Sequence, residues 1–210
     1  MISAMEVKFC VASLVNATGY KSTKSLEFLR NLVGRIKPSC VLELGTAFGA
    51  SAAYMAATIG DGKVISIDNY SGMYAKDVAN VQTIMDRLGF ADKVTLIKGD
   101  SRKSGEVLKQ AGIVVSPEIV FMDADHSYNG LVAEYSGFVA MLPKKHIVIV
   151  DDALADAKDE VKFVSELMCK YAFCVTIKNL HNGISLLCTD SEYLIKIADS
   201  IKDVITHGRS

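Results

Sequence analysis

The sequence predicts an α/β protein built on a doubly wound, seven-stranded, mostly parallel sheet with helices on both faces. Short apolar runs rich in Val and Ile alternate along the chain with longer segments of helical periodicity. The runs show no strict apolar–polar alternation, which is typical of parallel strands whose two faces are both covered. The last two runs are joined by a link too short for a crossover helix, so these strands should pair antiparallel.

Each expected element follows from its own stretch of sequence. Strands are expected at 40–44, 63–67, 93–97, 118–122, 146–150, 171–177 and 183–188. Helices are expected at 3–15, 23–36, 50–59, 71–89, 102–112, 128–142, 154–170 and 191–205. No repeat, low-complexity segment or linker interrupts this order, so we expect a single domain over residues 1–210.

Composition excludes several classes of protein. Twenty-three basic and twenty-four acidic residues nearly cancel, and without a basic block we expect no nucleic-acid partner. No apolar run approaches the roughly 18–20 residues that cross a bilayer, so we expect no membrane partner either. An odd number of cysteines without C-x-x-C spacing predicts buried thiols in a reducing, cytoplasmic compartment. These cysteines are Cys10, Cys40, Cys169, Cys174 and Cys188.

A carboxylate stands at the end of each of the first five expected strands. In an open α/β sheet, ligands bind where the carboxyl ends of the parallel strands meet. One such acid would indicate only a helix cap, because Asp caps the helices that follow strands. Five in succession favour a polar ligand over capping alone. The residues are Glu43, Asp68, Asp100, Asp123 and the pair Asp151 and Asp152.

The turn after the first expected strand, in "VLELGTAFGASAAYMA", indicates which class of ligand the site would bind. It has the form E-x-G-x-x-x-G, in which Gly45 allows a tight turn and Gly49 allows a ligand to approach the backbone at the helix start. A dinucleotide site would have a further glycine at position 47, where this chain has Ala47. A nucleoside without a pyrophosphate is therefore expected, with a ribose diol, an amino group or a sulfonium. Asp68 is placed to accept hydrogen bonds from ribose hydroxyls.

Together these stretches resemble class I S-adenosylmethionine-dependent methyltransferases. The first motif and "VTLIKGDS" are similar to the catechol and caffeoyl-CoA O-methyltransferase group, and "DHSY" is similar to a related branch. The resemblance covers about residues 16–190 and implies a Rossmann-like methyltransferase fold that binds S-adenosylmethionine. It divides the chain into N-terminal helices and a lid (1–37), a cofactor-binding core (38–190) and a C-terminal helix (191–210).

The resemblance also implies residues for the cofactor. Glu43 and Ser51 would hold the methionine moiety, and Asp68 the ribose, while Asp100 and Ser101 would lie at the edge of the adenine. The full implied set is Glu43, Gly45, Thr46, Gly49, Ser51, Asp68, Asn69, Gly99, Asp100, Ser101 and Asp123. In the lid, Asn16, Tyr20 and Lys21 are either substrate contacts or part of an exposed turn.

Metal-dependent members of the group bind a magnesium-type ion, and the resemblance places it at Asp123, Asp151 and Asp152. Oxygen ligands suit Mg²⁺, which would lower the pKa of a substrate hydroxyl for attack on the sulfonium methyl. Asp152 stands where the group has Asn, and it is alternatively the cap of the next helix.

His126 occupies the position of the general-base Lys of that group. Imidazole has an ordinary pKa of about 6.5, which suits a base near neutral pH. The alternative is a solvated turn residue. Tyr128 either lines the substrate pocket or packs on the following helix, and Asp125 is a helix cap, a supporting partner or a bystander.

We therefore expect an S-adenosylmethionine-dependent O-methyltransferase acting on a small hydroxylated molecule with the help of a divalent metal, with Asp123 and His126 as the catalytic residues. One alternative is a metal-independent methyltransferase that uses His126 on a sugar or nitrogen acceptor. An NAD(P)-dependent oxidoreductase is disfavoured by Ala47, and a cofactor-binding protein without catalysis is a further alternative. A homodimer is left open.

Overall fold

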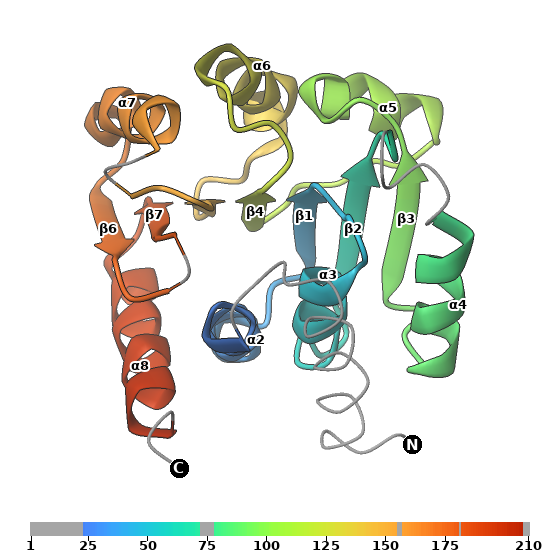
Figure 1. Ribbon diagram of the computed structural model, residues 1–210, viewed down its shortest axis with the longest axis horizontal. Helices are drawn as coiled ribbons and strands as arrows, with labels where there is room; N and C mark the ends of the chain where they lie inside the picture. The colour runs from blue at the N-terminus through green and yellow to red at the C-terminus, as the bar shows by residue number, and fades with distance from the viewer. Residues whose placement is uncertain (1–22, 72–77, 155–156, 181, 208–210) are drawn as a thin grey trace.

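A seven-stranded sheet forms the centre of the computed structural model, which describes residues 23–71, 78–154, 157–180 and 182–207. The strands are β1 (Cys40–Leu44), β2 (Lys63–Asp68), β3 (Val94–Lys98), β4 (Ile119–Met122), β5 (Ile147–Val150), β6 (Phe173–Ile177) and β7 (Ile184–Cys188). Their order is β3-β2-β1-β4-β5-β7-β6 (Figure 1). Strands β1 to β5 pair parallel, while β7 runs antiparallel to both β5 and β6. The predicted fold class is confirmed.

Helices cover both faces of this sheet. They are α2 (Thr23–Ile36), α3 (Ala50–Ala56), α4 (Val78–Arg87), α5 (Ser104–Gln110), α6 (Tyr128–Phe138), α7 (Lys158–Leu167) and α8 (Ser191–His207). Helices α5, α6 and α7 lie along one face, and α2, α3, α4 and α8 along the other (Figure 1). The first two crossovers, α3 and α4, thus lie on one face and the next three, α5 to α7, on the other, as in a doubly wound sheet.

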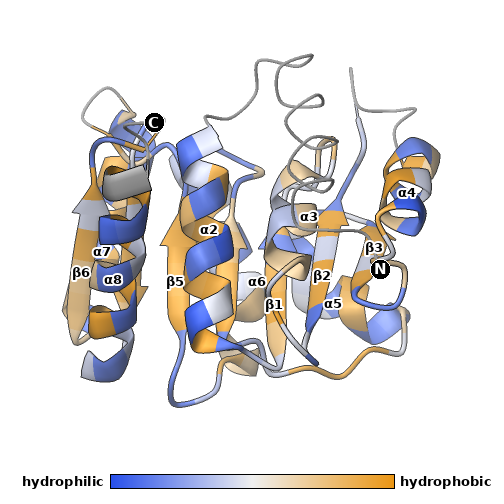
Figure 2. Cartoon of the chain, turned by 90° about the horizontal axis from the view of Figure 1, so that it is seen from below, coloured by the Kyte–Doolittle hydropathy of each residue, from blue (hydrophilic) through white to orange (hydrophobic). Residues whose placement is uncertain are grey.

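The strands supply both halves of the core, which is why their sequences do not alternate between apolar and polar residues. In β4, Ile119 and Phe121 pack with the α2 side, whereas Val120 and Met122 pack with the α6 side. All four are at most 1% exposed, and each such burial contributes about 1.5–3 kcal/mol. Figure 2 shows the apolar strands behind the hydrophilic outer faces of α2 and α8.

Helix α2 shows how one apolar stripe sets a helix on the sheet. Its buried residues fall at helical spacing, from Leu26 and Leu29 to Val33. The helix ends where Lys37 adopts a left-handed φ of 52° just before Pro38, which cannot continue a helix. An ion pair of 2.6 Å between Arg35 and Asp203 joins α2 to α8.

Several predicted boundaries differ from the structure. The helix expected at 102–112 is split into a 3-10 turn, Ser101–Lys103, and α5, because the Asp100 side chain accepts a hydrogen bond from the Arg102 N–H and caps the turn. The helix expected at 154–170 begins only at Lys158. The helix at 3–15 and the lid residues Asn16, Tyr20 and Lys21 lie outside the described residues, and the single-domain organisation stays a prediction.

The cysteines are only partly as expected. Cys40 and Cys188 are buried, and burial raises the pKa of each thiol to about 11. Cys174 is half-buried, and Cys169 is exposed, so the prediction is wrong there. Cys169 lies in the 3-10 turn Met168–Lys170 that follows α7, away from the packed face of the helix. None of the described helices has the length and hydropathy needed to span a membrane.

Gly45 should be irreplaceable for the fold. Its φ is 97°, and a Cβ added there would lie 2.2 Å from the carbonyl oxygen of Asp123. Gly45→Ala should therefore lower the free energy of unfolding by about 3 kcal/mol, from backbone strain and overlap together. Gly60→Ala is the control, because Gly60 also has a positive φ, 74°, but no atom within 4 Å of such a Cβ. That variant should lose only about 1 kcal/mol, and equal losses in urea denaturation would contradict the close approach.

Candidate active site

The carboxyl edge of the sheet, meaning the residues that directly follow β1, β3, β4 and β5, is held in register by backbone hydrogen bonds. The N–H of Gly45 donates to Ile67 at 2.9 Å, and the N–H of Gly99 donates to Asp68 at 2.9 Å. The N–H groups of Asp123 and Asp151 likewise donate to Leu44 and Met122, at 2.8 and 3.1 Å. The residues predicted to follow separate strands therefore meet at one edge.

Asp68 organises the turn after β1. Its Oδ2 accepts hydrogen bonds from the backbone N–H groups of Thr46 and Ala47, both at 2.9 Å. Its Oδ1 accepts a third from the N–H of Tyr70 at 2.6 Å. These three bonds from described residues make Asp68 the acceptor that shapes the turn, and its bond to a ribose stays a prediction.

Glu43 and Thr46 are linked through Ser66 on the neighbouring strand. The Ser66 hydroxyl donates to Glu43, and the Thr46 and Ser66 hydroxyl oxygens lie 2.6 Å apart. Glu43 is 0% and Thr46 2% exposed. This polar chain fixes the turn from inside the sheet, where a buried carboxylate needs such partners.

The glycines and small residues of the predicted cofactor set have packing roles. A Cβ on Gly49 would lie 2.6 Å from Val81 and 2.8 Å from Met85, so this glycine lets α4 pack against the start of α3. The space on the Cβ side of Gly49 is filled by α4, and a ligand's approach to its backbone stays a prediction.

The other members of the set lie around the same edge. A Cβ on Gly99 would lie 2.8 Å from Val107 of α5. Ser51 is buried in the first turn of α3. Asn69 is exposed, and its side chain accepts a hydrogen bond from the Ser71 N–H at 2.8 Å.

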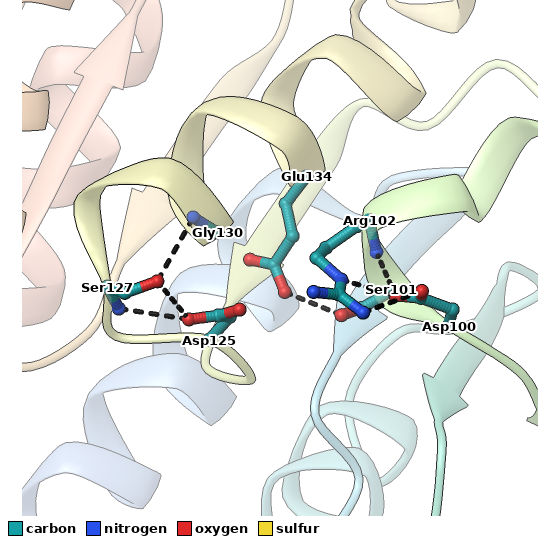
Figure 3. A network of polar contacts seen from close by, with 7 residues as sticks. All are labelled: Asp100, Ser101, Arg102, Asp125, Ser127, Gly130 and Glu134. Atoms are coloured by element: carbon teal, nitrogen blue, oxygen red, sulfur yellow. Dashed lines mark hydrogen bonds and ion pairs between the residues drawn. The ribbon is translucent and has the colours of Figure 1, made fainter.

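The turn after β3 is held on two sides. On the outside, the Arg102 guanidinium donates to both carboxylate oxygens of Asp100, at 2.9 Å each. On the inside, the Ser101 hydroxyl donates to Oε1 of Glu134 on α6 at 2.6 Å. Figure 3 shows Glu134 between this turn and the turn after β4.

Glu134 is a fully buried carboxyl group, 0% exposed. Burial raises its pKa to about 7, and the charges of Asp125 and Asp100 act in the same direction, while the hydrogen bond from Ser101 opposes them. The group therefore changes its charge near neutral pH.

In the turn after β4, Asp125 supports the helix cap. Its Oδ1 accepts hydrogen bonds from the N–H and the hydroxyl of Ser127, at 3.0 and 2.7 Å. The Ser127 hydroxyl in turn accepts from the Gly130 N–H at 3.1 Å and caps α6. A Cβ on Gly130 would lie 2.0 Å from the Asp125 carboxyl carbon. Of the three roles left open for Asp125, the structure gives it that of supporting partner, here of the capping serine.

His126 faces two carboxylates. Its Nδ1 lies 3.1 Å from Oε1 of Glu160 on α7 and 3.9 Å from Oδ2 of Asp152. The Glu160 side chain is 7% exposed and that of His126 is 44% exposed. A buried carboxylate on one ring nitrogen leaves the rest of the imidazole accessible, which is the arrangement of an oriented base.

Tyr128 packs on helix α7. Its N–H donates to Asp159 at 2.9 Å, its hydroxyl donates to Glu166, and the Lys162 ammonium lies 3.7 Å from its ring centroid. All three partners belong to α7, not to α6, which begins with Tyr128 itself. The "DHSY" turn is therefore the surface on which α7 docks.

The predicted metal site does not form. Within the part of the chain that the structure describes, no group of three or more His, Cys, Asp or Glu side chains is arranged to hold a metal ion. Asp123 and Asp151 directly follow the paired residues Met122 and Val150, and Asp152 adopts a left-handed φ of 55° with its Oδ2 3.9 Å from His126 Nδ1. Asp152 does not cap α7 either, because that helix begins at Lys158.

Sequence reasoning missed Glu134 and Glu160. Both are acids within helices, where an acidic residue usually indicates a solvated face. Glu160 also sits in the first turn of α7, where acids are common for reasons of the helix dipole. Only the helical phase could have identified them, since each lies on the buried side of its helix.

A family model described as a methyltransferase domain matches residues 42–153, which is more than half of the chain. The chain belongs to this methyltransferase family. The matched segment runs from β1 to the residues after β5 and so contains the whole carboxyl edge. The resemblance seen in the sequence is confirmed.

Relatives of this methyltransferase agree with the family and the fold. A catechol O-methyltransferase from Mycobacterium tuberculosis (strain ATCC 25618 / H37Rv) is 29% identical over 134 residues, which cover 63% of this chain and 56% of that protein. The match thus spans little more than half of that relative's length. An O-methyltransferase from Bacillus cereus in complex with SAH superposes with a TM-score of 0.70 at 17% identity, covering 90% of this chain and 93% of that one. A methyltransferase from Geobacter sulfurreducens gives 0.66 at 21% identity, with 90% and 91% covered.

Glu134 should make stability depend on pH. Its pKa is about 7 in the folded chain against an ordinary value of 4.5, so between these values the folded state holds more protons than the unfolded state. The free energy of unfolding should therefore fall as pH rises through this window, by about 2 kcal/mol between pH 5 and pH 8. Glu134→Gln should remove that fall in urea denaturation at each pH. Parallel pH curves for the two proteins would refute the assignment.

Proposed function

We propose that this methyltransferase is an S-adenosylmethionine-dependent O-methyltransferase that acts on a hydroxyl group of a small molecule. The observation that carries the proposal is that the family match contains the entire carboxyl edge, with its acids in register. The preference for oxygen is supported by the names of two relatives, a catechol O-methyltransferase and an O-methyltransferase in complex with SAH.

The cofactor would lie across the carboxyl edge. A ribose hydroxyl would bond to Asp68, whose carboxylate the turn already holds through backbone N–H groups. The adenine would lie at Asp100 and Ser101, next to Gly99 and Asn69. The half-buried Asp123 would take the amino group of the methionine moiety, since a carboxylate pairs well with an ammonium.

When bound, S-adenosylmethionine supplies an electrophilic sulfonium methyl. His126 would hold the acceptor hydroxyl and remove its proton at Nε2, while Nδ1–H donates to Glu160. Once deprotonated, the acceptor oxygen would bond to that methyl carbon as the carbon–sulfur bond breaks, with sulfur keeping the electron pair. The buried Glu160 balances the positive charge that His126 acquires.

The proposed mechanism uses no metal ion: within the described part of the chain, Asp123, Asp151 and Asp152 are not arranged as a group that could hold one. The enzyme would therefore use His126 as its base without a metal ion, and its acceptor atom would be an oxygen. A nitrogen or sugar acceptor would use the same base.

The cofactor can be tested by calorimetry. The chain should bind S-adenosylhomocysteine and not NAD, because position 47 lacks the glycine that a pyrophosphate needs. Asp68→Asn should weaken S-adenosylhomocysteine about 10-fold, through loss of a charge-assisted hydrogen bond. Asp61→Asn is the control, since Asp61 is exposed in the loop before β2, at the opposite edge. Binding of NAD without binding of S-adenosylhomocysteine would contradict the proposal.

The base can be tested by kinetics on a panel of catechols and phenols, with release of S-adenosylhomocysteine as the signal. His126→Ala should lower kcat about 100-fold or more, and Glu160→Gln about 10-fold by loss of orientation, both with little change in the cofactor KM. Glu166→Gln is a matched control on α7, because Glu166 contacts Tyr128 and not His126. If Glu166→Gln lowers kcat as much as Glu160→Gln, docking of α7 is the cause and the orienting role is wrong. Activity should also persist in EDTA. If chelation abolishes activity and Mg²⁺ restores it, Asp123, Asp151 and Asp152 would again be the candidate metal ligands.

A further inference from the structure

One face of helix α6 contacts both the turn after β3 and the turn after β4. Gly130 lies against the Asp125 carboxyl group, and Glu134 accepts the hydrogen bond from Ser101. One turn further along, a Cβ on Gly137 would lie 2.9 Å from the carbonyl oxygen of Arg102. Residues at positions 130, 134 and 137 share a helix face, so α6 contacts both turns with the same side.

The contact at Glu134 is the polar one, and it is shielded from water. Glu134 is 0% and Ser101 9% exposed, and their oxygens are 2.6 Å apart. A buried hydrogen bond in such surroundings is strong and directional, and its loss leaves an unpaired polar group. The Ser101 side chain is therefore held against α6, and the hydrogen bond to Glu134 fixes its position.

Charged groups around Glu134 come from both turns. Asp100 and Asp125 repel its carboxylate form, and the Arg102 guanidinium, paired with Asp100, is influenced by the charges of Asp125 and Glu134 as well. The acceptor oxygen Oε1 is available whether or not the other oxygen carries a proton. The hydrogen bond to Ser101 thus depends on the acceptor atom and not on the charge.

We propose that Glu134 is a positioning residue that sets the selectivity of this methyltransferase for the base of its nucleoside cofactor, by fixing Ser101 at the edge where the base binds. The inference rests on the proposed function, because Ser101 meets a base only if the cofactor lies across the carboxyl edge. A site with fixed polar groups rejects a ligand that mismatches them, and a loosened site rejects it less well.

The test compares S-adenosylhomocysteine with S-inosylhomocysteine, in which an oxo group replaces the amino group of the base. Calorimetry on the full chain should show that Glu134→Ala and Ser101→Ala each lower the preference for the adenine ligand about 10-fold. The double variant should lose no more than either single variant, since both break the same bond. Glu134→Gln should keep the preference, because the amide oxygen still accepts from Ser101.

Glu118→Ala is the matched control. Glu118 accepts hydrogen bonds from the N–H and hydroxyl of Ser39 at 2.6 and 2.7 Å, at the opposite edge of the sheet. Its removal should leave the base preference unchanged. Ser101→Ala deletes only a hydroxyl group, so it tests the bond even if Glu134→Ala does not fold.

The outcomes separate the two proposals. If the unaltered chain does not bind S-adenosylhomocysteine, the proposed function fails. If it binds with a clear base preference that Ser101→Ala leaves intact, only the role of Glu134 is overturned. A preference lost in Glu134→Gln as fully as in Ser101→Ala would also overturn it, because charge and not the acceptor atom would then be responsible.

Discussion

The absence of a side chain at Gly45 is the constraint on which the rest of the site depends. A backbone-to-backbone approach this close brings the exit of β1 against the exit of β4, with no room for even a methyl group. The turn that follows β1 then reaches the Asp68 carboxylate, which accepts its N–H groups, and the Asp123 backbone lies against Gly45. The parallel strands of an open α/β sheet end at a common edge. Here Gly45 lets the residues after β1 and after β4 lie in close contact at that edge.

Much of this arrangement could be predicted from the sequence, because parallel strands and their acidic ends have a short-range pattern. The strand at 118–122 is apolar throughout and is followed at once by Asp123, and the structure starts β4 within one residue of that expectation. The antiparallel pairing of β6 and β7 follows equally simply, from the shortness of the link between them.

What could not be predicted depends on contacts between distant segments. Glu160 meets His126 across 34 positions, and Glu134 meets Ser101 across 33. Nothing in the composition of α6 or α7 indicates that one of its acidic side chains is buried. The metal prediction also depends on distant segments, since it needs side chains after β4 and β5 to converge, and among the described residues no such group of ligands is found.

The stripe at 130, 134 and 137 gives α6 a fixed helical phase. Each residue advances the helix by about 100°, so a single insertion between Gly130 and Glu134 would leave the first contact in place and swing the other two away from the turn after β3. Insertions should therefore be absent from this interval in relatives that keep the two contacts with the turn after β3. The spacing of these three residues is therefore a property that a relative must keep to retain this coupling, even where the residues themselves differ.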